Sequence, residues 1–81
     1  MDLKQLEYIV MIAEENSITK AAERLFITQS GLNQQLLKLE AELGIQLFHR
    51  SKNDFRLTEA GQVYVSYAKK ILQLKHEAYN I

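Results

Sequence analysis

Residues 28–40, TQSGLNQQLLKLE, predict a helix with an apolar back and an uncharged front. Leu32, Leu36 and Leu39 recur at spacings of four and three, which line one face of a helix. Thr28 is a good N-cap, and Gly44 stands where helices favour a left-handed residue after their last turn. We therefore predict a helix over residues 29–43.

The front of this helix carries hydroxyl and amide side chains, and no charge precedes Lys38. These polar residues are Thr28, Gln29, Ser30, Asn33, Gln34 and Gln35. Such a face is either a surface that contacts a partner or an ordinary solvated helix face. The pattern of this helix alone leaves both interpretations open.

The composition indicates one small folded domain. The chain has 81 residues, of which 47% are apolar, and it contains no proline, no cysteine and three glycines. The absence of cysteine excludes a disulfide framework and a thiolate metal site, and it fits a reducing compartment, which we expect to be the cytoplasm. The longest apolar run, Tyr8–Ala13, is too short to span a bilayer. A net charge of zero lowers the expectation of a polyanionic partner but leaves room for a locally basic face.

Two further helices are predicted before residue 28. The first covers residues 3–15, with Asp2 as N-cap and Gln5 completing a capping box. The second covers residues 19–26, with Thr19 as its N-cap and Ala22 at the crossing with its neighbour. Two helices joined by a short turn predict a helix-turn-helix over about residues 18–37.

Residues 47–57, LFHRSKNDFRL, predict a small β-hairpin. Segments 47–50 and 55–57 flank the turn-forming cluster SKND. The basic side chains of this hairpin are His49, Arg50, Lys52 and Arg56. A basic hairpin beside a helix-turn-helix is typical of a wing that follows a phosphate backbone, although a short polar hairpin is also often merely solvated.

A last helix is predicted from residue 59 to the end of the chain. Its apolar residues alternate spacings of four and three: Ala60, Tyr64, Tyr67, Ile71, Leu74, Ala78 and Ile81. This is a heptad pattern of the kind that pairs helices. The helix either packs only on its own domain or dimerises with a second copy, and the pattern favours the homodimer.

The predicted front of residues 28–40 suits base recognition in a DNA major groove. Amide side chains of Asn and Gln bond adenine edges, and Ser or Thr bonds bases or phosphates. Free backbone N–H groups at the start of the helix favour a phosphate. The hairpin would add the positive charge that this face lacks.

The sequence resembles the N-terminal DNA-binding domain of LysR-type transcriptional regulators. The resemblance covers the whole chain and rests on these segments in order: SITKAAERL (17–25), TQSGLNQQL (28–36), LE (39–40), LG (43–44), LFHR (47–50) and LTEAG (57–61). It implies a mostly α fold, with a winged helix-turn-helix of three helices and a small β-hairpin wing over residues 1–58. A long linker helix for dimerisation is expected over residues 59–81.

The resemblance also implies roles for individual residues. Thr28 and Gln29 match positions that contact phosphate and bases, Asn33 and Gln34 match base-facing positions, and Arg50 matches the wing arginine. Combined with the residue types and charges, base recognition is expected from Gln29, Ser30, Asn33 and Gln34. Contact with phosphates or the minor groove is expected from Thr28, Lys38, Arg50, Lys52 and Arg56. The dimer seam would comprise Ala60, Tyr64, Tyr67, Ile71, Leu74 and Ala78. The chain departs from the family at Ser30, where proline is usual, at Gly31, where a small alanine-like residue is usual, and at Asn33, where serine is frequent. We expect its preferred DNA sequence to differ there.

The partners expected from the resemblance are double-stranded DNA and a second copy of the chain. The effector-binding domain of the family is expected to be absent from this chain, which we interpret as a DNA-binding fragment or an isolated unit. A small-molecule effector would act only through that missing domain, and whether full-length subunits form dimers or tetramers stays open. We expect no cofactor, no metal and no membrane partner.

An enzyme and a protein–protein module are the two alternative classes of function. An enzyme is disfavoured because His49 and His76 lie in different predicted elements, and because the carboxylate pairs Glu14-Glu15 and Glu40 with Glu42 are expected on solvated helix surfaces. A winged-helix module for protein–protein contact is the stronger alternative, since it explains the zero net charge. It leaves the base-recognising residue types of one helix face unexplained.

Overall fold

A computed structural model describes residues 2–51 and 54–80 of the chain. Within them the elements follow the order α1 (Leu3–Glu15), α2 (Ile18–Leu25), α3 (Gln29–Leu43), β1 (Phe48–Ser51), β2 (Asp54–Leu57) and α4 (Glu59–Tyr79). The predicted Lys52 contact, the centre of the hairpin turn and the seam residue Ile81 lie outside the described residues. The mostly α, winged helix-turn-helix fold predicted from the sequence is confirmed.

The caps of α1 and α3 are those that the sequence predicts. The Asp2 carboxylate accepts from the Gln5 backbone N–H at 2.8 Å, and the Gln5 side chain accepts from the Asp2 N–H, so the capping box is complete. Thr28 Oγ1 accepts from the Gly31 N–H at 3.0 Å, and Gly44 ends α3 with φ of 70°. These local signals therefore fix both ends of α3.

The second helix begins one residue earlier than predicted. Its N-cap is Ser17, whose hydroxyl accepts from the Lys20 N–H at 3.1 Å, so the prediction of Thr19 as the N-cap is wrong. Asn16 ends α1 in the left-handed region with φ of 50°, which places Ser17 in the extended conformation that an N-cap requires. The turn from α1 to α2 is therefore tighter than the sequence suggested.

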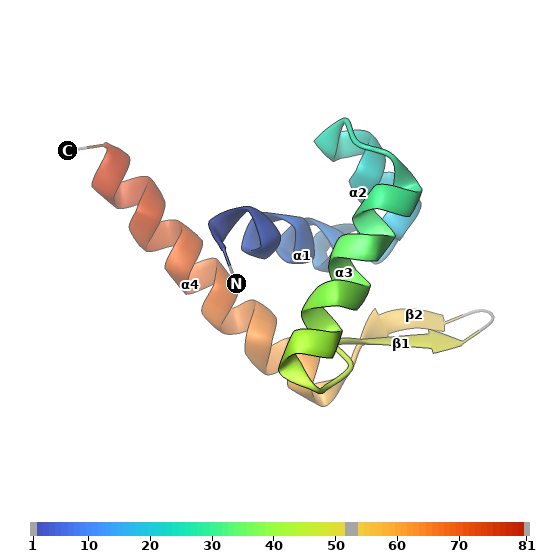
Figure 1. The fold of residues 1–81 in the computed structure, drawn as a ribbon. Helices are drawn as coiled ribbons and strands as arrows, with labels where there is room; N and C mark the ends of the chain where they lie inside the picture. Colours follow the sequence, from blue (N-terminus) through green and yellow to red (C-terminus); the bar gives the residue numbers. More distant parts are fainter. Residues whose placement is uncertain (1, 52–53, 81) are drawn as a thin grey trace.

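The core forms where α1 crosses the other helices. Helix α1 packs against α2, α3 and α4, and α2 packs against α3. The largest fully buried side chains are Phe48, Ile9, Ile12, Leu32, Leu36, Leu39 and Leu47. Figure 1 shows that the hairpin and α4 extend from this core to opposite sides.

The hairpin is a two-stranded antiparallel sheet in which Phe48 pairs with Leu57 and His49 with Arg56. Phe48 is fully buried and stacks on Phe55 with ring centroids 4.8 Å apart. Strand β1 begins one residue later than predicted, where the Leu47 N–H bonds a side chain of α3, and β2 begins one residue earlier, where Asp54 pairs with Ser51. The root of the wing is therefore part of the core.

Helix α4 begins against the loop that precedes the wing. The Thr58 hydroxyl donates to the Gln46 carbonyl at 2.7 Å and accepts from the Gly61 N–H at 2.9 Å. Further along, Lys75 Nζ lies 3.0 Å from Glu7 Oε1 and ties α4 to α1. These contacts tie the first turn of α4 and a turn near its C-terminal end to the rest of the domain.

Candidate nucleic-acid interface

The first turns of α3 present the predicted polar face to solvent. Thr28, Gln29, Ser30 and Gln34 are exposed, Asn33 is half-buried, and Lys38 is exposed one turn further on. Their helix is anchored from behind by Leu32, Leu36 and Leu39, which are buried in the core. The uncharged front and the apolar back of the sequence pattern are therefore opposite faces of one rigid helix.

The start of α3 also offers backbone donors. The Thr28 side chain caps Gly31 N–H, while the carbonyl of Thr28 accepts the first helical bond from Leu32 at 3.0 Å. A helix start of this kind carries partial positive charge and suits a phosphate oxygen. Thr28 is therefore positioned at the end of α3 where a backbone phosphate would be stabilised.

Gly31 is better suited to its position than helix propensity alone suggests. Glycine in a helix costs about 1 kcal/mol relative to alanine. A Cβ at Gly31 would, however, lie 2.8 Å from Thr28 Oγ1, the oxygen that caps the helix. The cap would have to shift to accommodate alanine, which offsets part of the propensity gain.

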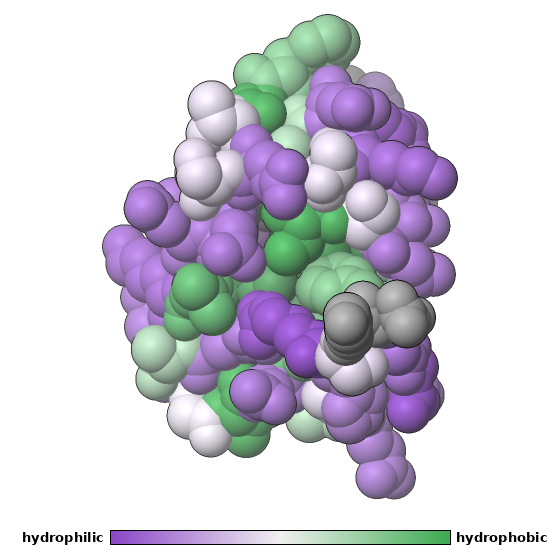
Figure 2. All heavy atoms as spheres, turned by 90° about the vertical axis from the view of Figure 1, so that its right-hand side faces the viewer, coloured by the Kyte–Doolittle hydropathy of each residue, from purple (hydrophilic) through white to green (hydrophobic). Residues whose placement is uncertain are grey.

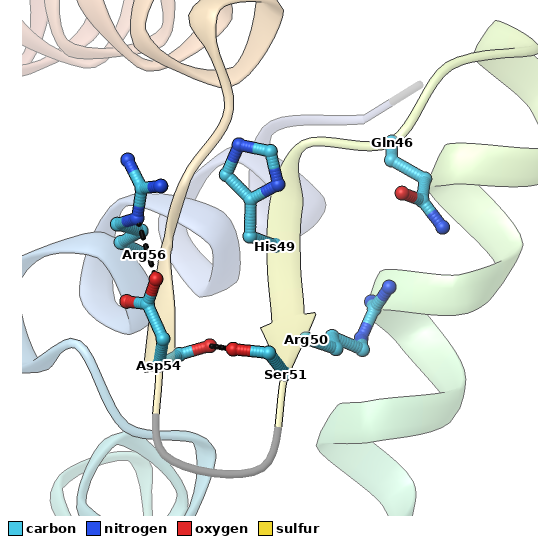
Figure 3. A pocket seen from close by; sticks show the side chains of 6 residues that line it. All are labelled: Gln46, His49, Arg50, Ser51, Asp54 and Arg56. Carbon is cyan, nitrogen blue, oxygen red and sulfur yellow. Dashed lines mark hydrogen bonds and ion pairs between the residues drawn. The ribbon is translucent and has the colours of Figure 1, made fainter.

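The wing carries polar side chains around a shallow hollow of ≈ 410 Å³, lined by Gln46, His49, Arg50, Ser51, Asp54 and Arg56. Figure 3 shows Arg50 reaching from β1 toward α3, whereas Arg56 lies on the β2 side of the hairpin. The pairing of His49 with Arg56 puts these two side chains on one face of the hairpin. Figure 2 views the molecule from the side on which the hairpin projects and shows hydrophilic side chains around a smaller hydrophobic area at the centre of that face.

Both wing arginines that lie within residues 2–51 and 54–80 are paired with carboxylates. Arg56 Nε lies 2.7 Å from Asp54 Oδ2, and both side chains are largely exposed. Arg50 Nη2 lies 2.6 Å from Glu40 Oε1. An exposed ion pair contributes only about 0–1 kcal/mol, so Arg56 can exchange Asp54 for a phosphate at little cost.

Glu40 is the residue of this region that the sequence prediction misassigned. It was expected on a solvated surface, but its side chain is only 7% exposed and accepts from Leu47 N–H, Phe48 N–H and Arg50. A signal was present, because Glu40 follows Leu36 by four residues and so falls on the buried stripe of α3. A carboxylate on an apolar stripe indicates a paired, buried group.

Some residues of the predicted dimer seam on α4 are exposed to solvent, and others are half-buried. Tyr67, Ile71, Leu74 and Ala78 are exposed, whereas Ala60 and Tyr64 are half-buried against their own domain. The exposed residue Val63 extends the stripe instead. We call the four exposed residues Val63, Tyr67, Ile71 and Leu74 the α4 stripe.

Tyr64 has an unusual environment. Its hydroxyl is buried and has no hydrogen-bond partner among the described residues. Burial raises the pKa of Tyr64 above its ordinary value of 10.0, and the negative charge of Glu42 raises that pKa further. The hydroxyl is therefore neutral at physiological pH and contributes apolar packing with an unsatisfied polar atom.

Comparison with known families identifies the group to which this arrangement belongs. Residues 3–62 match the family model described as the bacterial regulatory helix-turn-helix protein, lysR family. The chain belongs to this family. The match covers α1 to α3, the wing and the start of α4, which are the elements that carry the polar face and the hairpin.

Curated relatives of this LysR-family chain are named as transcriptional regulators and not as enzymes. The chain is 47% identical over 77 residues to the uncharacterized HTH-type transcriptional regulator YcgK of Bacillus subtilis (strain 168), covering 95% of the chain and 24% of the relative. It is 44% identical over 72 residues to the regulator BenM of Acinetobacter baylyi (strain ATCC 33305 / BD413 / ADP1), covering 89% and 24%. The chain thus spans about a quarter of the length of these relatives.

Solved structures give the same result for the fold. The crystal structure of the BenM DBD in complex with catB site 1 DNA matches with a TM-score of 0.95 and 40% identity, covering 99% of this chain and 89% of that one. The CbnR DBD–DNA complex matches with a TM-score of 0.91 and 35% identity, covering 99% and 92%. The LysR-family chain is therefore a helix-turn-helix DNA-binding domain.

In its described residues, no helix is long and apolar enough to cross a membrane.

Proposed function

We propose that this chain binds double-stranded DNA sequence-specifically, as the DNA-binding part of a bacterial LysR-type transcriptional regulator. The observation that carries the proposal is the exposed, uncharged face on the first turns of α3, held rigidly by its buried leucines beside a polar wing. The fold match to the BenM and CbnR complexes with DNA supports it.

In this proposal, Gln29, Ser30, Asn33 and Gln34 contact base edges in the major groove. Amide side chains bond adenine through two atoms at once, which discriminates against a wrong base by about 1–3 kcal/mol per contact. Gln34 is exposed and lies six residues past the cap Thr28, nearly two helical turns into α3. Ser30, Gly31 and Asn33 are where the preferred sequence would differ from that of relatives.

Phosphate contacts are assigned to a second set of residues: Thr28, Lys38, Arg50, Arg56 and Lys52, the last outside the described residues. Thr28 and Lys38 lie at either end of the polar face of α3, while the arginines lie on the wing. The charge needed for affinity therefore comes from residues flanking the base-facing amides. This division is consistent with the zero net charge of the chain.

We propose that the DNA-bound form is a homodimer paired through α4, which lies in the predicted linker segment of residues 59–81. The support is the α4 stripe, whose exposed apolar side chains follow helical spacing on a face of α4 that is turned away from buried Val65 and Ala68. A dimer would present two copies of α3 to two related half-sites. A small-molecule effector would act through the remainder of the full-length regulator, and a chromosomal target implies work in the bacterial cytoplasm.

The test begins with selection of bound duplexes from a random pool. The selected duplex and a random duplex are then titrated with the chain at several salt concentrations. DNA binding predicts that log K falls linearly with log salt, by about 0.9 for each phosphate contacted. Arg56→Ala would lower this slope by about one unit on both duplexes. Affinity that does not fall with salt would contradict the phosphate contacts, and a chain that selects no duplex would favour the alternative of a protein–protein module.

A further inference from the structure

The Glu40 carboxylate joins the recognition helix to the wing. Its Oε2 accepts from the Leu47 N–H at 2.6 Å and from the Phe48 N–H at 3.3 Å. Its Oε1 accepts from Arg50 Nη2 at 2.6 Å. One side chain of α3 thus bonds both the backbone that enters β1 and a guanidinium of β1.

These bonds are strong because the carboxylate is withdrawn from solvent. Glu40 is buried, and hydrogen bonds that involve an ionised partner are about twice as strong as neutral ones. The apolar root of the wing is anchored separately, through fully buried Leu47 and Phe48 and the stack of Phe48 on Phe55. The buried side chains therefore attach the hairpin to the core, and the bonds to Glu40 mainly determine how the hairpin is oriented.

Arg50 keeps a second capacity while it is bound to Glu40. Arg50 bonds the carboxylate through Nη2, and 29% of its side chain remains exposed beside the hollow of the wing. A guanidinium has five donors in a fixed plane, so the others stay available for a phosphate. Glu40 thus limits the directions in which Arg50 can point.

We propose that Glu40 is a positioning residue for DNA recognition, which rests on the proposed function above. It fixes the wing and Arg50 relative to the base-facing turns of α3, so that both engage one duplex in a single register. Without this link, the wing would still attract phosphates but would no longer hold α3 at the depth and angle that base contacts require. Loss of Glu40 would therefore reduce discrimination between duplexes more than it reduces affinity for DNA in general.

The test compares Glu40→Gln with Glu42→Gln in the full 81-residue chain. Both changes remove one carboxylate from α3, but Glu42 is exposed. Affinity is measured on the selected and the random duplex, and the melting temperature is recorded for each variant. We expect Glu40→Gln to lower the ratio of the two affinities by about tenfold, with random-duplex affinity unchanged or higher. Glu42→Gln should leave that ratio as in the wild type.

The outcomes separate this inference from simpler ones. An unchanged ratio in folded Glu40→Gln, or an equal loss on both duplexes, would assign Glu40 a purely structural role and overturn the inference. If Glu40→Gln does not fold, Arg50→Lys decides the question, because it keeps the charge and the bonds from the backbone to Glu40. A lowered ratio in Arg50→Lys supports the inference, and an unchanged one overturns it. If the wild type binds no duplex, the proposed function itself fails.

Discussion

The backbone of Gly61, in the first turn of α4, lies directly against the backbone carbonyl of Leu47. A Cβ at Gly61 would overlap this carbonyl, and the overlap is with backbone atoms that cannot rotate away. We expect Gly61→Ala to lower the free energy of unfolding by about 3 kcal/mol, which corresponds to a drop of roughly 10–20 °C in Tm.

Gly44→Ala is the matched control for this prediction. Gly44 has φ of 70°, but a Cβ there would meet no atom within 4 Å. Its substitution should cost only the left-handed strain of about 1 kcal/mol. Thermal unfolding of both variants measures the difference, and equal losses would mean that the approach of α4 to Leu47 is not close.

Replacing the buried hydroxyl of Tyr64 should stabilise the domain. An unsatisfied buried polar group costs about 1–3 kcal/mol, so Tyr64→Phe should raise the free energy of unfolding by about 1 kcal/mol at pH 7. Tyr79→Phe, which removes a hydroxyl from an exposed ring, should have no effect. A destabilised Tyr64→Phe would show that the hydroxyl has a partner in solution.

The same residue predicts a dependence on alkaline pH. The folded pKa of Tyr64 is raised above the unfolded value of 10.0, so the folded state favours the protonated form. The stability that comes from keeping Tyr64 protonated is fully present below pH 10 and is lost as the pH rises through the raised pKa. Denaturant unfolding from pH 8 to 11 should show the wild type losing more stability than Tyr64→Phe. Parallel curves would contradict the raised pKa.

Phe26, in the turn between α2 and α3, is 94% exposed and has φ of 58°. The Ile27 N–H donates to the Ala22 carbonyl at 3.1 Å, as in helix ends that favour glycine at this position. Phe26→Gly should therefore stabilise the domain by about 1 kcal/mol in chemical denaturation. Asn16→Gly should raise the free energy of unfolding by less, because asparagine tolerates the left-handed region. A destabilised Phe26→Gly would show that the phenyl ring contributes packing.

The α4 stripe predicts the oligomeric state. Leu74 is 65% exposed, so Leu74→Lys would place a charge in the proposed dimer contact without disturbing the core of the subunit. Gln73→Lys adds the same charge on the polar face of α4. Sedimentation at micromolar concentration should give a dimer for the wild type and for Gln73→Lys, and a monomer for Leu74→Lys. A wild type that sediments only as a monomer would refute a stable contact.

Local sequence signals predicted α3 well because its ends are set by its own residues. Thr28 caps one end and Gly44 closes the other, while the leucine spacing decides which face is buried. Ser17 was missed because the cap depends on where Asn16 ends the preceding helix. A local pattern therefore fails to predict a helix start when that start depends on where the preceding helix ends.

Tertiary contacts explain what the sequence could not predict about the site. The heptad spacing of α4 did not distinguish Tyr64, which packs on its own domain, from Tyr67, which faces solvent. Nor did the positive charge of Arg50 reveal its partner Glu40, ten residues away on another element. Side-chain types predicted the polar face of α3, but the link between α3 and the wing required the three-dimensional structure.

Base recognition by α3 is the central step of the proposed function, and Gln34→Ala tests it most directly. Gln34 is exposed on the polar face, and Gln62→Ala on the exposed side of α4 is the matched control. Affinities for the selected duplex and a random duplex are measured at one salt concentration. If Gln34 contacts a base, Gln34→Ala weakens binding of the selected duplex about tenfold and leaves binding of the random duplex unchanged. Equal weakening of both duplexes, or no change in either, would contradict it.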